Sequence, residues 1–175
     1  MMSEHLGVVI EVWPVAADDA GIWLVSGDDA WRSGRVDSDH EPHDEVEYTL
    51  ASHDLLDSAA LLHSTSWRMD EHAVVLTYMA VLKSAGVVPE VWPDARPVSA
   101  ALLAVVGQPA ASPVTEPPAP RYIDVLMHGI RHLRFLMDTD SAAREALPDV
   151  WRRHLEPITP VLAGMYERGQ RPVAL

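Results

Sequence analysis

The chain has 175 residues, 48% of them hydrophobic, no cysteine and a formal net charge of −13. Such a hydrophobic content excludes a disordered chain, and the lack of cysteine excludes disulfides and thiolate chemistry. The charge is uneven, at −14 for residues 1–95 and +1 for residues 96–175, so the acidic first part should repel phosphate backbones, and we expect no nucleic-acid partner.

The first fifty residues contain two strand patterns and then a helix. Residues 8–13 are β-branched and apolar and precede Pro14, and residues 21–25 repeat the pattern after a tight connection, so we predict two strands. Residues 28–47 are acidic and rich in turn formers, which predicts a loop. Apolar residues at helical spacing then predict a short amphipathic helix that begins near Pro42.

The next fifty residues contain the strongest apolar run. Residues 60–67 are predicted to form a strand. After a polar turn, residues 72–82 form a long apolar run, which predicts a central strand. A shorter strand is predicted at residues 87–92, and a helix at residues 97–106. The apolar runs, such as residues 100–106, are too short to span a membrane.

Beyond this point only helices are predicted. Residues 107–120 contain five prolines, a composition typical of a semi-extended linker. Residues 121–137 carry an apolar stripe at helical spacing. A short helical pair at residues 141–147 and 148–155 and a last helical face at residues 158–165 follow.

We therefore expect an α+β fold, with a mixed β-sheet and flanking helices in residues 1–106, a Pro-rich linker at 107–120 and a helical segment at 121–175. A segment of about 55 residues has too small a core to be stable alone. We expect it to dock through its apolar faces on the first domain, on a second copy of the chain or on another protein. The N-terminus has no basic region before its apolar stretch, so we expect no signal peptide, no membrane partner and a cytoplasmic location.

Histidines occur in two patterns that could suggest metal ligands. His43, His53 and His63 are ten residues apart, a spacing that no single helix or strand brings together, so we interpret them as part of a solvated acidic surface. His128 and His132 are four apart, which is a ligand spacing on a helix. They lie well away from the centre of the apolar stripe, so we expect them to face water or a partner.

Trp31 is a candidate ligand platform, since it stands between polar residues in the predicted loop; packing at the rim of the core is the alternative. The other tryptophans mostly stand at the ends of predicted strands, where packing is the simpler interpretation.

The order of the predicted elements resembles that of the Nudix hydrolases. The stretch from Gly34 to Leu56 has the 23-residue length of the family's box, and its first glycine and two apolar positions match Gly34, Leu50 and Leu56. The other box positions differ. His40 stands for the first glutamate, and the remaining replacements are Tyr48 and Thr49 for Arg-Glu, Ser52 and His53 for Glu-Glu, and Leu55 for the second glycine.

This resemblance implies a nucleotide-like cleft. Our candidate ligand contacts are Trp31, His40 and His53. The family's glutamates hold magnesium beside a diphosphate, and their replacement implies loss of the usual activity and no cofactor. We expect a non-catalytic domain that binds a small molecule or a protein. The alternative is a divergent hydrolase of a nucleoside diphosphate-like substrate, whose divalent metal, such as Mg²⁺, would be held by Glu45, Glu47, Asp54 and Asp57.

Overall fold

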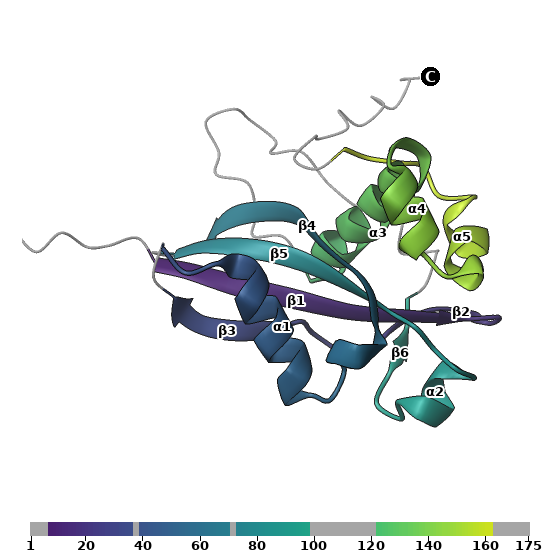
Figure 1. The fold of residues 1–175 in the computed structure, drawn as a ribbon, viewed down its shortest axis with the longest axis horizontal. Helices are drawn as coiled ribbons and strands as arrows, with labels where there is room; N and C mark the ends of the chain where they lie inside the picture. The colour runs from purple at the N-terminus through teal and green to yellow at the C-terminus, as the bar shows by residue number, and fades with distance from the viewer. Residues whose placement is uncertain (1–6, 37–38, 71–72, 99–121, 163–175) are drawn as a thin grey trace, which may run out of the picture.

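The computed structural model describes residues 7–36, 39–70, 73–98 and 122–162 (Figure 1). The described part of the chain is a mixed sheet with helices packed on it. Its strands are β1 (Gly7–Asp18), β2 (Gly21–Leu24), β3 (Trp31–Val36), β4 (Ala59–Asp70), β5 (Ala73–Leu82) and β6 (Arg96–Pro97). Its helices are α1 (Pro42–Ser52), the 3-10 turn η1 (Leu56–Ser58), α2 (Val88–Val91), α3 (Tyr122–Thr139), α4 (Ser141–Ala146) and α5 (Asp149–Leu155).

β1 is the central strand of the sheet. The strands are ordered β4-β5-β1-β2-β6, and β3 pairs with β1 on the same side as β2. β1 runs parallel to β5 and antiparallel to both β2 and β3, while β4 and β5 form an antiparallel pair. The predicted α+β class with a mixed sheet is therefore confirmed.

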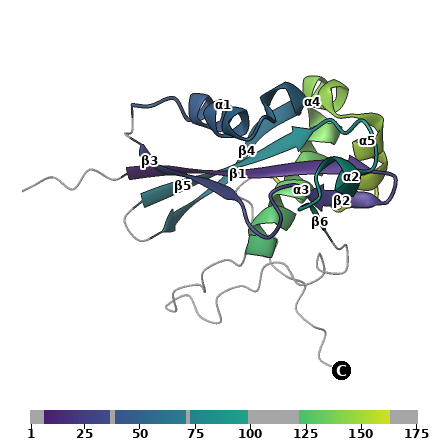
Figure 2. The ribbon, with the colours of Figure 1, turned by 90° about the horizontal axis from the view of Figure 1, so that it is seen from below.

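Alternate residues of β1 serve two apolar cores, one on each face of the sheet. The first core joins Trp13, Val15 and Ala17 to residues of α3, α4 and α5. The second joins Ile10, Val12 and Ala16 to residues of α1 and α2. Successive side chains of a strand point to opposite faces, so these helices cover opposite faces of one sheet. Figure 2 shows α1 on one side of the strands and the beginning of α3 on the other.

The helical segment docks on the sheet of its own chain. Ile130, Leu133 and Trp151 are fully buried in the core shared with β1, β2 and β5. Gly129 permits the close approach, because a Cβ atom at this position would lie 2.4 Å from Sδ of Met79. Arg153 adds an exposed ion pair with Asp19, whereas Arg134 and Arg152 pair with acids of their own helices. None of the described helices is long and apolar enough to cross a membrane.

Asp18 joins three elements at the turn after β1. One of its carboxylate oxygens accepts hydrogen bonds from the backbone of Ala20 and Gly21 and from Trp23 Nε1. The other oxygen accepts from the N–H of Val88, at the beginning of α2, at 2.8 Å. The backbone carbonyl of Asp18 accepts from Nε2 of His154 in α5 at 2.7 Å. One residue therefore fixes the β1–β2 hairpin, α2 and α5.

Three sequence-based expectations about the strands are wrong. β1 was expected to end before Pro14 but continues through it to Asp18. The carbonyl oxygen of Pro14 accepts a hydrogen bond from the N–H of Val25, which follows β2. The N–H that proline lacks would lie on this same side, so the pairing of β1 with β5 on the other side is not affected. The predicted loop at 28–47 contains β3. The predicted strand at 87–92 is the short helix α2, which has a proline in its first turn.

The remaining expectations fall partly outside the described residues. The helices expected at 121–137, 141–147 and 148–155 correspond to α3, α4 and α5. Residues 158–162 are not helical, contrary to the expectation, while 163–165 lie beyond the described part. The helix expected at 97–106 is contradicted at Pro97, which belongs to β6, and its last residues and the linker at 107–120 lie outside the described ranges.

Candidate functional site

Two of the three predicted ligand contacts lie against each other. The rings of Trp31 and His53 are stacked, with centroids 3.6 Å apart and planes inclined by 5°. Trp31 is the first residue of β3, not part of a loop, and packs against the apolar core under α1. His53 is exposed and caps the C-terminus of α1. The fold thus brings together two side chains that are 22 positions apart in the chain.

The third predicted contact, His40, lies at the other end of α1. Its Nε2 is 3.5 Å from the carboxylate of Glu45, and Nε2 of His43 is likewise 3.5 Å from the carboxylate of Glu47. Glu45 and Glu47, two of the candidate magnesium ligands, are therefore each beside a histidine. His40 and His53 flank the helix instead of converging on one point.

The other two candidate magnesium ligands follow α1. Asp54 and Asp57 are exposed, and Asp54 has a positive φ of 58°. Within the described residues, no three His, Asp or Glu side chains form a group that could hold a metal ion. The four candidate ligands are thus not assembled around one position.

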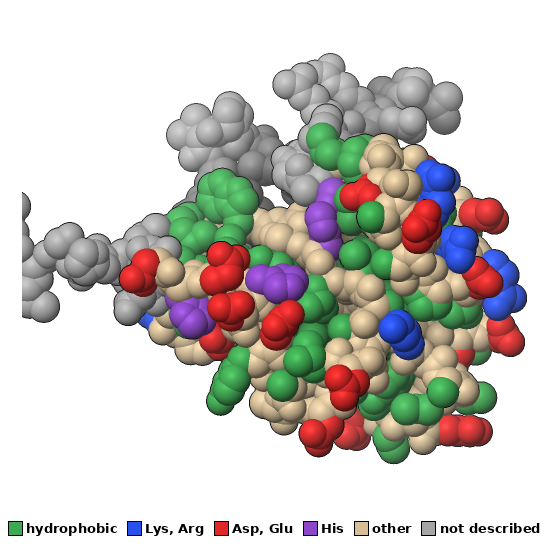
Figure 3. Space-filling model, in the orientation of Figure 1, with side chains coloured by type: hydrophobic (Ala, Val, Ile, Leu, Met, Phe, Trp, Pro, Cys, Tyr) green, Lys and Arg blue, Asp and Glu red, His purple; other side chains and the backbone are tan. Residues whose placement is uncertain are grey.

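The charges are unevenly distributed on the face shown in Figure 3, although acidic side chains also lie beside the basic ones. In Figure 3, acidic and histidine side chains gather at the left, over α1, while most of the Lys and Arg side chains in view lie at the right, over α4 and α5. The surroundings of α1 therefore disfavour an anionic ligand.

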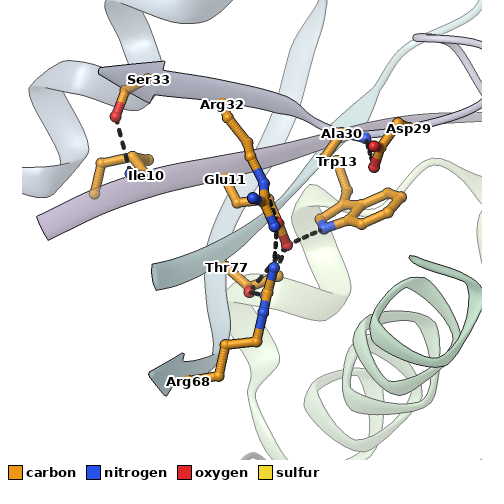
Figure 4. A network of polar contacts seen from close by, with 9 residues as sticks. All are labelled: Ile10, Glu11, Trp13, Asp29, Ala30, Arg32, Ser33, Arg68 and Thr77. Carbon is orange, nitrogen blue, oxygen red and sulfur yellow. Dashed lines mark hydrogen bonds and ion pairs between the residues drawn. The ribbon is translucent and has the colours of Figure 1, made fainter. Parts of the chain in front are cut away.

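A buried carboxylate lies in the middle of the sheet, on the face that carries Trp13 (Figure 4). Glu11 is only 1% exposed. Arg68 donates to both of its oxygens, at 3.0 Å and 2.5 Å, and Arg32 donates from Nε at 2.9 Å. Trp13 Nε1 donates at 2.9 Å, and the Thr77 hydroxyl at 3.4 Å.

This network keeps Glu11 ionised. Burial alone would raise the pKa of Glu11, but hydrogen bonding and charge attraction from Arg68, with smaller effects of Trp13 and Arg32, hold it below its ordinary value. A carboxylate with a lowered pKa and two arginines as partners is a poor general acid. Its contacts make it a connector of β1, β3, β4 and β5.

His63 of β4 and His132 of α3 lie against each other, a contact that the sequence did not predict. Nε2 of His132 lies 3.2 Å from Nε2 of His63, and Nδ1 of His132 lies 3.2 Å from the carbonyl oxygen of Val161. His128, one turn earlier in α3, has a buried Nε2 with no hydrogen-bond partner among the described residues. The expectation that the two histidines face water or a partner is wrong for His132, which is 3% exposed and faces His63 of the sheet, whereas His128 is only partly buried.

Burial lowers the pKa of all three histidines. For His63 the neighbouring His132 lowers the pKa further, and Asp140 acts weakly in the opposite direction. His132 and Arg131 lower the pKa of His128 in the same way, against a hydrogen bond to the backbone of Thr65. The pKa of His132 is lowered by burial despite its contact with Val161. All three rings are therefore neutral near pH 7, with nitrogen lone pairs available.

No protein-family model matches the chain, and no curated protein matches it at a significant level.

Proposed function

We propose that this chain is a non-catalytic binding domain on a Nudix-like scaffold, and that it binds a small molecule with a planar ring at Trp31. The observation that supports the proposal is the parallel stack of His53 on Trp31 at 3.6 Å. A flat ring already occupies this face of the indole, so a ligand ring has the same contact available once His53 moves away.

The two partners of the stack differ in how firmly they are held. Trp31 is half-buried, packs on the core under α1 and pairs with Val12 of the central strand. His53 is exposed, and it follows the last turn of α1 and precedes the left-handed residue Asp54. Rotation of an exposed side chain breaks only its own stacking contact. Trp31 therefore serves as a fixed platform, and His53 as a removable cover.

The charges around the stack narrow the class of ligand. Asp54 is adjacent to His53 and is the acidic residue nearest to it in the chain, whereas Asp44 and Glu45 lie in the first turn of α1, at the other end of the helix. Negative charge at close range disfavours phosphate groups. We therefore propose a neutral or cationic planar compound, in place of the nucleoside diphosphate that the family resemblance implies.

The arrangement of α1 supports the scaffold part of the proposal. Three strands precede this helix, two long strands follow it, and it packs on one face of the sheet through Val46 and Leu50. The resemblance to the Nudix hydrolases rests on a helix between the first strands and two further strands, which this order keeps. It differs at β3, where a loop was expected, and at α2, where a short strand was expected.

Calorimetric titration with adenosine, riboflavin and ADP tests the proposal. We expect at least one of the two uncharged compounds to bind more tightly than ADP. Binding should weaken roughly 5- to 150-fold in Trp31→Leu, the range for loss of one stacking contact. In His53→Ala it should strengthen, because the ligand no longer competes with the cover.

Trp67→Leu is the matched control, since Trp67 is a 68% exposed tryptophan on β4. Its binding should equal that of the wild-type chain. If neither the wild-type chain nor His53→Ala binds any of the three compounds, the proposal is wrong. Magnesium-dependent turnover of a nucleoside diphosphate compound that is lost in Glu45→Gln would instead establish the hydrolase alternative.

A further inference from the structure

We propose that His63 and His132 together bind a divalent transition-metal ion such as Zn²⁺ or Co²⁺ through their two Nε2 atoms, with water completing the coordination. This site lies between β4 and α3 and is independent of the proposed function at Trp31.

The positions of the two rings carry the proposal. Their Nε2 atoms are 3.2 Å apart, while the ring centroids are 5.2 Å apart, so each ring points a nitrogen at the other. Two imidazole nitrogens on one tetrahedral zinc ion, each about 2.0–2.1 Å from the metal, lie roughly 3.3–3.4 Å apart. The separation of the two nitrogens therefore already matches that of two ligands on one tetrahedral ion.

The hydrogen-bonding of His132 prepares its Nε2 as a ligand. The carbonyl oxygen of Val161 can only accept, so Nδ1 of neutral His132 carries the proton and donates it. Nε2 of His132 then has a free lone pair directed at His63. A ring whose second nitrogen donates to a backbone carbonyl is the usual arrangement of a metal-binding histidine.

The proton on His63 must move when the ion binds. In the metal-free chain Nε2 of His63 donates to the lone pair of His132, which explains their 3.2 Å contact. When an ion enters, His63 loses this proton from Nε2 and takes one up on Nδ1, which is the other neutral form of the ring. Both Nε2 lone pairs then point at the metal, with no net release of protons.

The surroundings hold the two ligands in place. His63 pairs in register with Met79 on β5, and His132 is buried in α3 with the ring of Phe135 at 5.8 Å. Asp140 lies close enough to His63 to favour positive charge there. Two imidazoles favour zinc, cobalt, nickel or copper over magnesium, which prefers oxygen ligands.

His128 is a matched control for this site. His128 lies on the same helix as His132 and is also partly buried. It does not join His63 and His132 in a metal-binding group, and neither does any other His, Asp or Glu of the described residues. The exposed pairs of His40 with Glu45 and His43 with Glu47 are the competing positions for an added ion.

Calorimetric titration of the full chain with ZnCl₂ at pH 7.5, with MgCl₂ for comparison, tests the site. We expect saturable binding of one zinc ion and much weaker binding of magnesium. Removing a residue that only hydrogen-bonds to a metal ligand weakens metal binding about 10–100-fold. His63 is a proposed ligand itself, so His63→Ala should weaken zinc binding at least about tenfold. His132→Ala should do the same, and His128→Ala should change the affinity less than about threefold.

Nitrogen NMR of the imidazoles in the wild-type chain gives a second measurement, which holds even if His132→Ala fails to fold. Added zinc should shift the Nε2 signals of His63 and His132. The proposal is wrong if zinc does not bind at 1 mM, about the weakest affinity relevant to a site, or if His63→Ala binds it as tightly as the wild-type chain. It is equally wrong if only the signals of His40 and His43 shift.

Discussion

Glu11 is a charged side chain in the interior of the protein. Side chains from three other strands contact its carboxylate. Arg32 comes from β3, Arg68 from β4 and Thr77 from β5, and all three contact its carboxylate. A buried charge with good partners adds little net stability compared with an apolar residue, but removing one partner leaves the others uncompensated. The network therefore makes these strands depend on each other.

Replacement of Glu11 by glutamine should destabilise the chain by about 3 kcal/mol at pH 7, the lower end for breaking a buried ion pair, because Arg32 and Arg68 keep some contact with water. The folded-state pKa of Glu11 lies below its ordinary value of 4.5. Its contribution is therefore complete above about pH 4.5 and is lost as the pH falls through the folded-state pKa.

Urea unfolding at pH 7 and at pH 3 checks this expectation. The difference between the wild-type chain and Glu11→Gln should shrink at the lower pH, while Glu145→Gln, an exposed acid on α4, should have no effect at either pH. A difference that does not depend on pH would mean that shape, and not charge, makes Glu11 important.

At the scale of single residues, the sequence identified Trp31 and His53 as candidates but not their contact. Stacking across 22 positions depends on the path from β3 through α1, which no local pattern encodes. In the sequence, the ten-residue spacing groups His63 with His43 and His53. Its partner His132 is 69 positions away, so only the tertiary fold reveals the pair.

At the scale of elements, α3 lies close to β5 because Gly129 has no side chain. In an exposed helix, alanine is favoured over glycine by about 1 kcal/mol. Here a Cβ atom would lie 2.4 Å from Sδ and 2.8 Å from Cγ of Met79. Met79 is fully buried, so its Sδ and Cγ atoms would have to shift within the core to admit a methyl group.

We expect Gly129→Ala to destabilise the chain by about 1–3 kcal/mol, the usual cost of overpacking a core. Gly86→Ala is the control, because a Cβ atom at Gly86 would meet nothing within 4 Å. Urea unfolding of both variants gives the comparison. If Gly129→Ala is as stable as the wild-type chain, Met79 can repack, and the absence of a side chain at residue 129 does not contribute to stability.

Elements whose apolar residues follow a strong periodic pattern can be predicted from the sequence. Elements that form only because of their neighbours in the folded sheet cannot. The stripe at 121–137 predicted α3, and the apolar run before Lys83 predicted β5. β3 is not predicted from the sequence because only Trp31 and Val36 of its six residues are apolar; it pairs with β1. α2 was mistaken for a strand because four or five apolar residues fit either structure.

At the scale of the whole molecule, the sheet and the helical segment share one core. Ile130, fully buried in α3, lies in the same cluster as Trp13 of β1 and Met79 of β5. The segment was expected to dock, but the sequence could not say where. An apolar stripe specifies that a face is buried and not which surface covers it.

Replacement of Ile130 by aspartate should therefore unfold the sheet together with the helices. An unpaired carboxylate in this core costs more than about 4 kcal/mol, a large part of the stability of a typical domain. Circular dichroism and tryptophan fluorescence should change in one coincident transition. Val91→Asp, at a 47% exposed position on α2, should leave that transition near its wild-type position.

The opposite result would be a variant that loses helical signal but keeps the tryptophan fluorescence of a folded sheet. It would mean that residues 1–106 remain folded without α3–α5.

The contact between His154 and Asp18 joins residues 136 positions apart, and this has a consequence for synthesis of the chain. β1, β2 and β5 leave the ribosome before α3, α4 and α5. At roughly 5–20 residues per second, several seconds pass between the end of β5 and the end of α5. During that interval Trp13, Val15 and Met79 have no helices to cover them. Nascent chains are then most exposed to aggregation and most dependent on chaperones.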